Sequence, residues 1–145
     1  MTNAVAINCT DDVVSKVESV TGLKGRVFTV FSEEELIERT KGLGFPCVGV
    51  VYDGMRAISE PGSTHKIGGS AELVISVIVF FKQETRAQRD VKAEALQYLD
   101  SIRSTLLKSK APSGHFWKFQ VEASIDGKTG VLAYLQRWAA PVQLV

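Results

Sequence analysis

Hydrophobic residues in the second half of the chain first alternate with other residues and then repeat at helical spacing. Residues 72–81 predict a strand, because every second residue is apolar and these residues share one face of a strand. That face carries Leu73, Ile75, Val77, Val79 and Phe81. The other face is polar at its start and apolar at its end. This is typical of a strand that is central in a covered sheet or covered by another subunit.

A long amphipathic helix is predicted over residues 86–108. Thr85 can cap it, with Gln88 three residues later. Its apolar stripe consists of Val91, Ala95, Tyr98, Leu99, Ile102 and Leu106. A hairpin follows, with arms over residues 116–125 and 131–138. The first arm alternates so regularly that it predicts a half-buried strand.

Shorter elements are predicted in the first half of the chain. They are a helix from a Thr10 or Asp11 cap to about Val20, strands over residues 26–31 and 47–53, a helix over residues 32–41, and an exposed loop over residues 54–70. Ser32 and Glu35 form a capping box for the second helix. A parallel pairing of the two strands is allowed but not required.

Together these elements predict one α+β domain over residues 1–145. We expect a mostly antiparallel sheet of about four to five strands, packed against one long helix and two shorter helices. The length suits a single domain, and 45% apolar with 23% charged residues is typical of a soluble globular protein. The net charge of +1 gives no global attraction to nucleic acid or to an anionic membrane. It divides into −2 over residues 1–70 and +3 over residues 71–145.

The cysteines and the N-terminal segment indicate synthesis and folding in a cytoplasm. Cys9 and Cys47 do not form a disulfide framework. Residues 1–8 have neither the basic region nor the long apolar region of a signal peptide. The longest apolar runs are too short to span a bilayer.

Catalytic and cofactor motifs are incomplete in this sequence, so we expect no cofactor and no resident metal. The two histidines, His65 and His115, are not arranged at metal-ligand spacing with other ligands. Gly42 and Gly44 begin a dinucleotide fingerprint, but Cys47 stands where the third glycine is needed.

One enzymatic alternative remains open. Asp53 is expected at the end of a strand and Glu60 in the following loop, where carboxylates could hold magnesium in a small nuclease with Lys66 nearby. The simpler interpretation is that Asp53 and Gly54 form a turn. A non-catalytic module that binds a small ligand or a regulatory partner is also possible on this sequence.

Basic residues gather around the predicted start of the long helix. They are Lys82, Arg86, Arg89 and Lys92. Cations at a helix N-terminus are slightly unfavourable to that helix. The cluster is therefore either an ordinary solvated face or a surface for phosphate or for acidic residues of a neighbouring subunit.

The order of elements resembles the tail-terminator proteins of long-tailed bacteriophages. The resemblance rests on residues 72–138, in particular the strand Glu-Leu-Val-Ile-Ser-Val-Ile-Val-Phe-Phe, the long helix and the closing hairpin. It covers about half of the chain closely and the rest loosely. These phage proteins share no sharp sequence motif, so the resemblance is one of pattern and length.

The resemblance implies a structural, non-enzymatic role in the virion. Proteins of this family form a ring, usually hexameric, on the completed tail tube. The ring stops tube polymerisation and offers a surface for head–tail joining. The implied partners are other copies of the chain, the tail tube protein and the head–tail connector protein. Assembly would take place in the host cytoplasm, without a membrane and without sequence-specific binding of nucleic acid.

Two sets of residues are predicted to form the assembly interface. The loop over residues 55–70 would become ordered on contact with the tube or a neighbour, and it contributes Arg56, His65 and Lys66. Arginines on the long helix would pair with acidic residues of an adjacent subunit. These arginines are Arg86, Arg89 and Arg103, and the acids are Glu33, Glu34 and Glu38.

Overall fold

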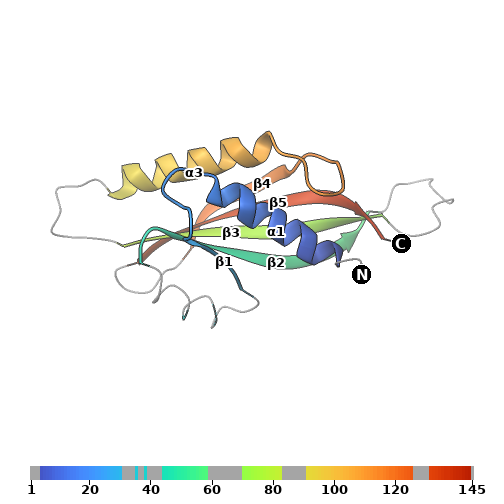
Figure 1. Ribbon diagram of the computed structural model, residues 1–145, viewed down its shortest axis with the longest axis horizontal. Helices are drawn as coiled ribbons and strands as arrows, with labels where there is room; N and C mark the ends of the chain where they lie inside the picture. Colours follow the sequence, from blue (N-terminus) through green and yellow to red (C-terminus); the bar gives the residue numbers. More distant parts are fainter. Residues whose placement is uncertain are drawn as a thin grey trace.

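The computed structural model shows one α+β domain with a five-stranded, mostly antiparallel sheet and two helices packed against it (Figure 1). It describes residues 4–30, 35, 38, 44–58, 70–82, 91–125 and 131–144. The elements are α1 (Val5–Glu18), β1 (Val27–Val30), β2 (Cys47–Ala57), β3 (Ser70–Lys82), α3 (Val91–Leu107), β4 (Lys118–Ile125) and β5 (Val131–Gln143). The predicted fold class and the long-helix-plus-hairpin arrangement are thereby confirmed.

The strand order is β1-β2-β3-β5-β4, so β3 is the central strand. β1 and β2 pair in parallel, and the other neighbours pair antiparallel. A parallel pair needs a crossover connection. Glu35 and Glu38, which are helical, lie in the segment that connects β1 to β2. The rest of the helix predicted over residues 32–41 lies outside the described residues.

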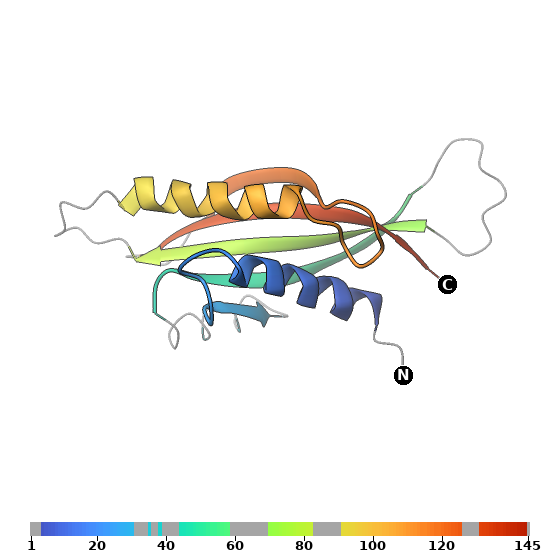
Figure 2. The ribbon, with the colours of Figure 1, turned by 45° about the horizontal axis from the view of Figure 1, so that its top comes forward.

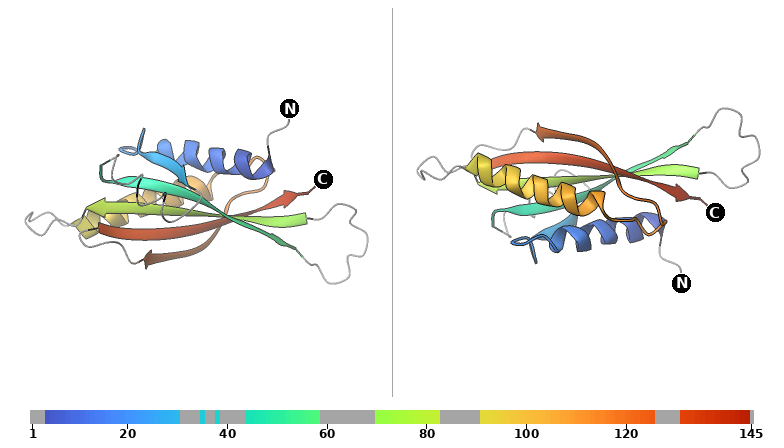
Figure 3. Two further views of the ribbon diagram at one scale, coloured as in Figure 1. Left: turned by 90° about the horizontal axis from the view of Figure 1, so that it is seen from below. Right: turned by 90° about the horizontal axis from the view of Figure 1, so that it is seen from above.

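Both helices cover the same face of the sheet, which we call the covered face (Figure 2). In Figure 3, α3 lies behind the strands in the left view and in front of them in the right view. The helices bury their apolar stripes against alternate residues of the central strands. The buried stripes consist of Cys9, Val13 and Val17 on α1, and Ala95, Leu99, Ile102 and Leu106 on α3.

The opposite face of the sheet, the open face, changes character along the strands. At one end a second buried cluster consists of Phe28, Val30, Cys47, Ile78, Phe80 and Ala133. Toward the other end, β3 carries Glu72 and Ser76 on this face, opposite Pro141 and Arg137 of β5. The mixed second face predicted for residues 72–81 is therefore real, and β3 is central, as one of the two expected arrangements requires.

Several predicted boundaries were wrong. α1 begins at Val5, and the Thr10 hydroxyl donates to the Ala6 carbonyl at 2.7 Å, so Thr10 lies inside the helix instead of capping it. β2 continues to Ala57 because its last residues pair with β3, so the predicted loop over residues 54–70 starts too early. β5 continues to Gln143 in the same way.

α3 begins at Val91 in the described part of the chain. The cap predicted at Thr85 and Gln88 lies outside the described residues. Across the described parts of the chain, no helix is long and apolar enough to cross a membrane.

Candidate assembly surfaces

β4 forms one edge of the sheet and is exposed along most of its length. Among the described strands it pairs only with β5. Phe119 is 39% exposed and Val121 is 38% exposed, and Phe116, just before the strand, is 52% exposed. The strand predicted within residues 116–125 is confirmed as Lys118–Ile125, but its predicted alternation of buried and exposed residues was wrong.

A β-bulge in β4 explains this error. Phe119 lies opposite Trp138 and Val121 lies opposite Arg137, so one residue of β4 is inserted between these two pairs. Trp138 belongs to the covered face and Arg137 to the open face. Two apolar residues that a regular strand would place on one face are thus divided between both faces. Neither face of β4 is then continuously apolar.

Polar groups anchor α3 to the hairpin on the covered face. The Arg103 guanidinium donates to Glu122 at 2.5 Å and also bonds Asp100. The buried Gln136 amide donates to Glu122 at 2.8 Å and to the Leu99 carbonyl at 3.0 Å. Arg103 was predicted to reach an adjacent subunit, but its partners in the structure belong to its own chain.

Arg56 stands on the open face, near the end of β2. Its Nε donates to Glu72 at 2.9 Å and one terminal nitrogen bonds the same oxygen. The Gln120 amide reaches this oxygen from β4 at 3.2 Å. The Arg56 side chain is 68% exposed, whereas that of Glu72 is only 17% exposed. Arg56 is therefore a positioned, accessible cation, which is compatible with its predicted interface role.

A second polar cluster on the open face joins three strands. β2 is irregular between Tyr52 and Gly54, and the intervening Asp53 accepts a hydrogen bond from the Ser76 hydroxyl of β3. Arg137 of β5 places its Nε 3.6 Å from the same carboxylate oxygen. Ser76 and Arg137 were missed in the sequence. The available signal was a serine in the middle of an otherwise apolar run.

The surroundings of Asp53 bear on the nuclease alternative. Asp53 does not end its strand, and its neighbouring cation is the Arg137 guanidinium. In the described part of the chain, no group of three or more His, Cys, Asp or Glu residues could hold a metal ion. Glu60 and Lys66 lie outside the described residues, so that part of the hypothesis stays untested.

The cysteine thiols are poor nucleophiles. Burial raises the pKa of Cys9 and of Cys47 to about 11. Because the thiolate is the nucleophilic form, both residues act as small buried apolar groups near neutral pH.

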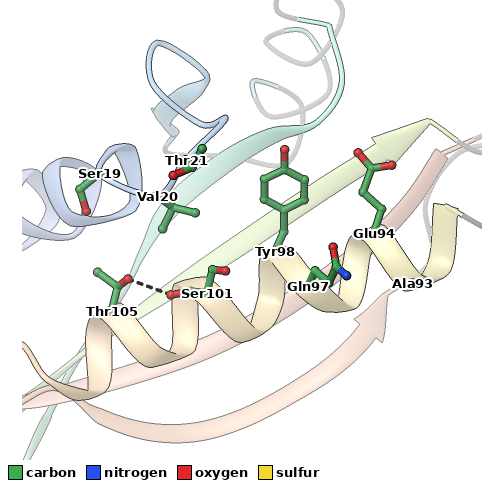
Figure 4. A pocket seen from close by; sticks show the side chains of 9 residues that line it. All are labelled: Ser19, Val20, Thr21, Ala93, Glu94, Gln97, Tyr98, Ser101 and Thr105. Carbon is green, nitrogen blue, oxygen red and sulfur yellow. Dashed lines mark hydrogen bonds between the residues drawn. The ribbon is translucent and has the colours of Figure 1, made fainter.

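A polar groove of about 780 Å³ separates the end of α1 from α3 (Figure 4). Its lining consists of Ser19, Val20, Thr21, Ala93, Glu94, Gln97, Tyr98, Ser101 and Thr105. Tyr98 rises from α3 toward the loop after α1. A Cβ on Gly22 would stand 2.6 Å from the Tyr98 hydroxyl, and φ is +93° there, so this close approach requires glycine. The groove offers hydroxyl and amide groups for hydrogen bonding.

The remaining predicted interface residues are not brought together in the structure. Arg56 lies on the open face and Arg103 on the covered face, while Glu38 is an exposed helical residue. The other predicted members lie outside the described residues: Glu33, Glu34, His65, Lys66, Arg86 and Arg89. His115 is exposed in the turn before β4.

Comparison of the chain with protein-family models gives no match, and comparison with curated proteins gives none either.

Proposed function

We propose that this protein is a structural subunit that assembles into a ring on the end of a phage tail tube. The ring stops tube polymerisation and presents a surface to the head–tail connector protein. The observation that carries the proposal is the exposed edge strand β4 with its accessible apolar side chains. The element order, from the central strand through α3 to the hairpin, agrees with the resemblance to tail-terminator proteins.

An exposed edge strand favours association with another chain. Among the described strands, the outer backbone N–H and C=O groups of β4 have no strand partner. Natural proteins usually block such edges with lysine, proline or a covering element. In β4 the residues from Val121 to Ile125 include one charged side chain, and Glu122 is bound by Arg103 and Gln136. The middle of the edge is therefore open to a partner.

The two edges of the sheet also suit a ring. One edge is the four-residue β1 and the other is the eight-residue β4, so they are unlike surfaces. Contacts between unlike surfaces of identical subunits form rings when the rotation closes. In a closed ring on the tube end, each subunit contacts its two neighbours through two unlike surfaces, and the two rims of the ring remain for the tube and the connector.

The proposal is tested by the solution mass and by electron micrographs of the purified protein. We expect annular particles, and tube elongation should stop when the protein is added to polymerising tail tube subunits. Val121→Lys should shift the protein to monomers without changing its melting temperature, because a lysine at the edge blocks strand addition. Val5→Lys is the matched control, since Val5 is a valine of α1 with the same exposed fraction as Val121 (38%).

Two results would contradict the proposal. One is a wild-type protein that stays monomeric at every concentration and salt. The other is a folded protein that forms rings but leaves tube elongation unchanged.

A further inference from the structure

Two arginines on the open face are held in place while donor groups remain available. Arg56 donates hydrogen bonds to Glu72 through Nε and one terminal nitrogen, and the Nε of Arg137 lies 3.6 Å from the Asp53 carboxylate. Among the described residues, the Arg56 Nη1 and both terminal nitrogens of Arg137 have no hydrogen-bond partner. Their side chains are 68% and 44% exposed. Each arginine therefore presents free N–H groups from an anchored position.

The anchoring is built into the sheet. Ser76 is 2% exposed and donates to Asp53, which lies at the β-irregularity between Tyr52 and Gly54. Glu72 is mostly buried and is also held by Gln120. A free arginine loses much rotamer entropy on binding, whereas an arginine fixed beforehand loses less. A planar guanidinium fork recognises carboxylates with defined geometry.

The balance of charge favours a protein partner over nucleic acid. The two arginines and their anchors, Glu72 and Asp53, sum to zero charge. A polyanion binds through an excess of cations that displaces counterions, and this patch has no such excess. Individual carboxylates on a protein can meet the arginines one by one, which suits a patch of alternating charge.

α1 carries carboxylates that fit this requirement. Asp12 is paired with Lys16 at 2.8 Å, while Asp11 and Glu18 have no ion-pair partner among the described residues. They lie seven residues apart and so share one helix face. They border a depression of about 530 Å³, which Val14, Ser15, Ser19 and Lys24 also line. α1 packs on the covered face, so these acids cannot reach Arg56 or Arg137 of the same chain.

We propose that Arg56 and Arg137 of one copy bind Asp11 and Glu18 on α1 of the next copy. The inference rests on the proposed ring and names a contact between neighbouring subunits. It joins two unlike surfaces on opposite sides of the domain, which is the arrangement that a head-to-tail ring needs. It is independent of β4, because none of the four residues belongs to that strand.

A charge-swap experiment tests this contact. The first variant is Arg56→Glu with Arg137→Glu, and the second is Asp11→Arg with Glu18→Arg. Each alone should remain monomeric at concentrations at which the wild type forms rings, because like charges then face each other. An equimolar mixture should form rings again, since each variant supplies the surface that the other requires. Lys108→Glu, an exposed residue directly after α3 and outside both surfaces, should assemble as the wild type does.

The outcomes separate this contact from the proposed function. Rings formed by either variant alone, or a mixture of two folded variants that stays monomeric, would overturn the contact and leave the ring intact. A wild type that never assembles would overturn both. Circular dichroism and the melting temperature report folding. If the first variant unfolds, Arg56→Gln with Arg137→Gln replaces it and should raise the concentration for half-assembly about tenfold; an unchanged concentration would overturn the contact.

Discussion

The two faces of the sheet are made from the same strands but differ in how their polar groups are used. On the covered face, the buried Gln136 is bonded on both sides of its amide and locks α3 to the hairpin. On the open face, the buried Ser76 bonds Asp53, which faces the partly exposed Arg137. Gln136 thus holds α3 against the hairpin within the core, whereas Ser76 helps to position a charged group at the surface.

This difference assigns different roles to the faces. Removing side chains from the covered face should lower the free energy of unfolding, and assembly should suffer only as a consequence. Changes on the open face near Arg137 should alter assembly while the monomer stays folded. A substitution that violated this separation would break the comparison.

The largest effect is expected at Trp138, which is fully buried on the covered face. Its ring packs edge-on against the Phe119 ring, with the two ring centroids 5.4 Å apart. Trp138→Ala should lower the free energy of unfolding by about 3–5 kcal/mol, through lost burial and the cavity left behind. Urea denaturation followed by circular dichroism measures it. Leu96→Ala on α3, where Leu96 is 45% exposed, is the control and should change stability little.

For each single thiol a pH effect of slightly smaller size is expected, because Cys9 lies in the covered core and Cys47 in the open-face cluster. Burial raises their pKa from 9.0 to about 11, so the folded chain holds these protons more tightly than the unfolded chain. The stabilisation is complete below pH 9 and disappears as the pH rises to 11. The loss is about 2–3 kcal/mol per thiol.

Denaturation midpoints measured from pH 8 to 11 report this loss. Replacing both cysteines by alanine should flatten the curve by the contribution of the thiols. An equally steep curve in the cysteine-free variant would exclude the thiols as its source.

The next effect concerns the hydrogen bonds of the buried Gln136 on the covered face. Gln136→Leu removes the partner of three groups, namely the Trp138 indole N–H, the Glu122 carboxylate and the Leu99 carbonyl. The free energy of unfolding should fall by about 1–3 kcal/mol, because a buried polar group left without a partner carries its desolvation cost. Amide hydrogen exchange in α3 should accelerate as well. Unchanged exchange would show that Gln136 does not hold the helix.

Periodicity was sufficient to predict most of the covered face. The apolar stripe of α3 and the alternation of β3 follow directly from residue spacing, and Leu73, Ile75 and Leu99 are buried as that spacing requires. The ends of strands were harder to predict from the sequence, because β2 and β5 are extended by pairing with β3. Such pairing depends on residues distant in sequence and leaves no local signal.

The candidate surfaces were harder to predict, for two physical reasons. A bulge in β4 separates Phe119 from Val121, and nothing in the strand's regular alternation marks the inserted residue. The positioning of Arg137 depends on Asp53 and Ser76, which are far away in the chain and meet only across the sheet. Arg56 could be named in advance because it is a cation within the predicted loop, although the structure places it in β2.

The smallest stability effect, and the sharpest test of the comparison, is expected at Ser76. Ser76→Ala removes the hydroxyl that bonds Asp53 and should lower the free energy of unfolding by about 1 kcal/mol. If the open face serves assembly, the concentration for half-assembly should nevertheless rise, because Asp53 then holds Arg137 less firmly. Sedimentation velocity over a concentration series measures this, with Ser101→Ala on α3 as the control. The reverse pattern, with a stability loss as large as that of Gln136→Leu and unchanged assembly, would mean that Ser76 belongs to the core and that the two faces do not differ in role.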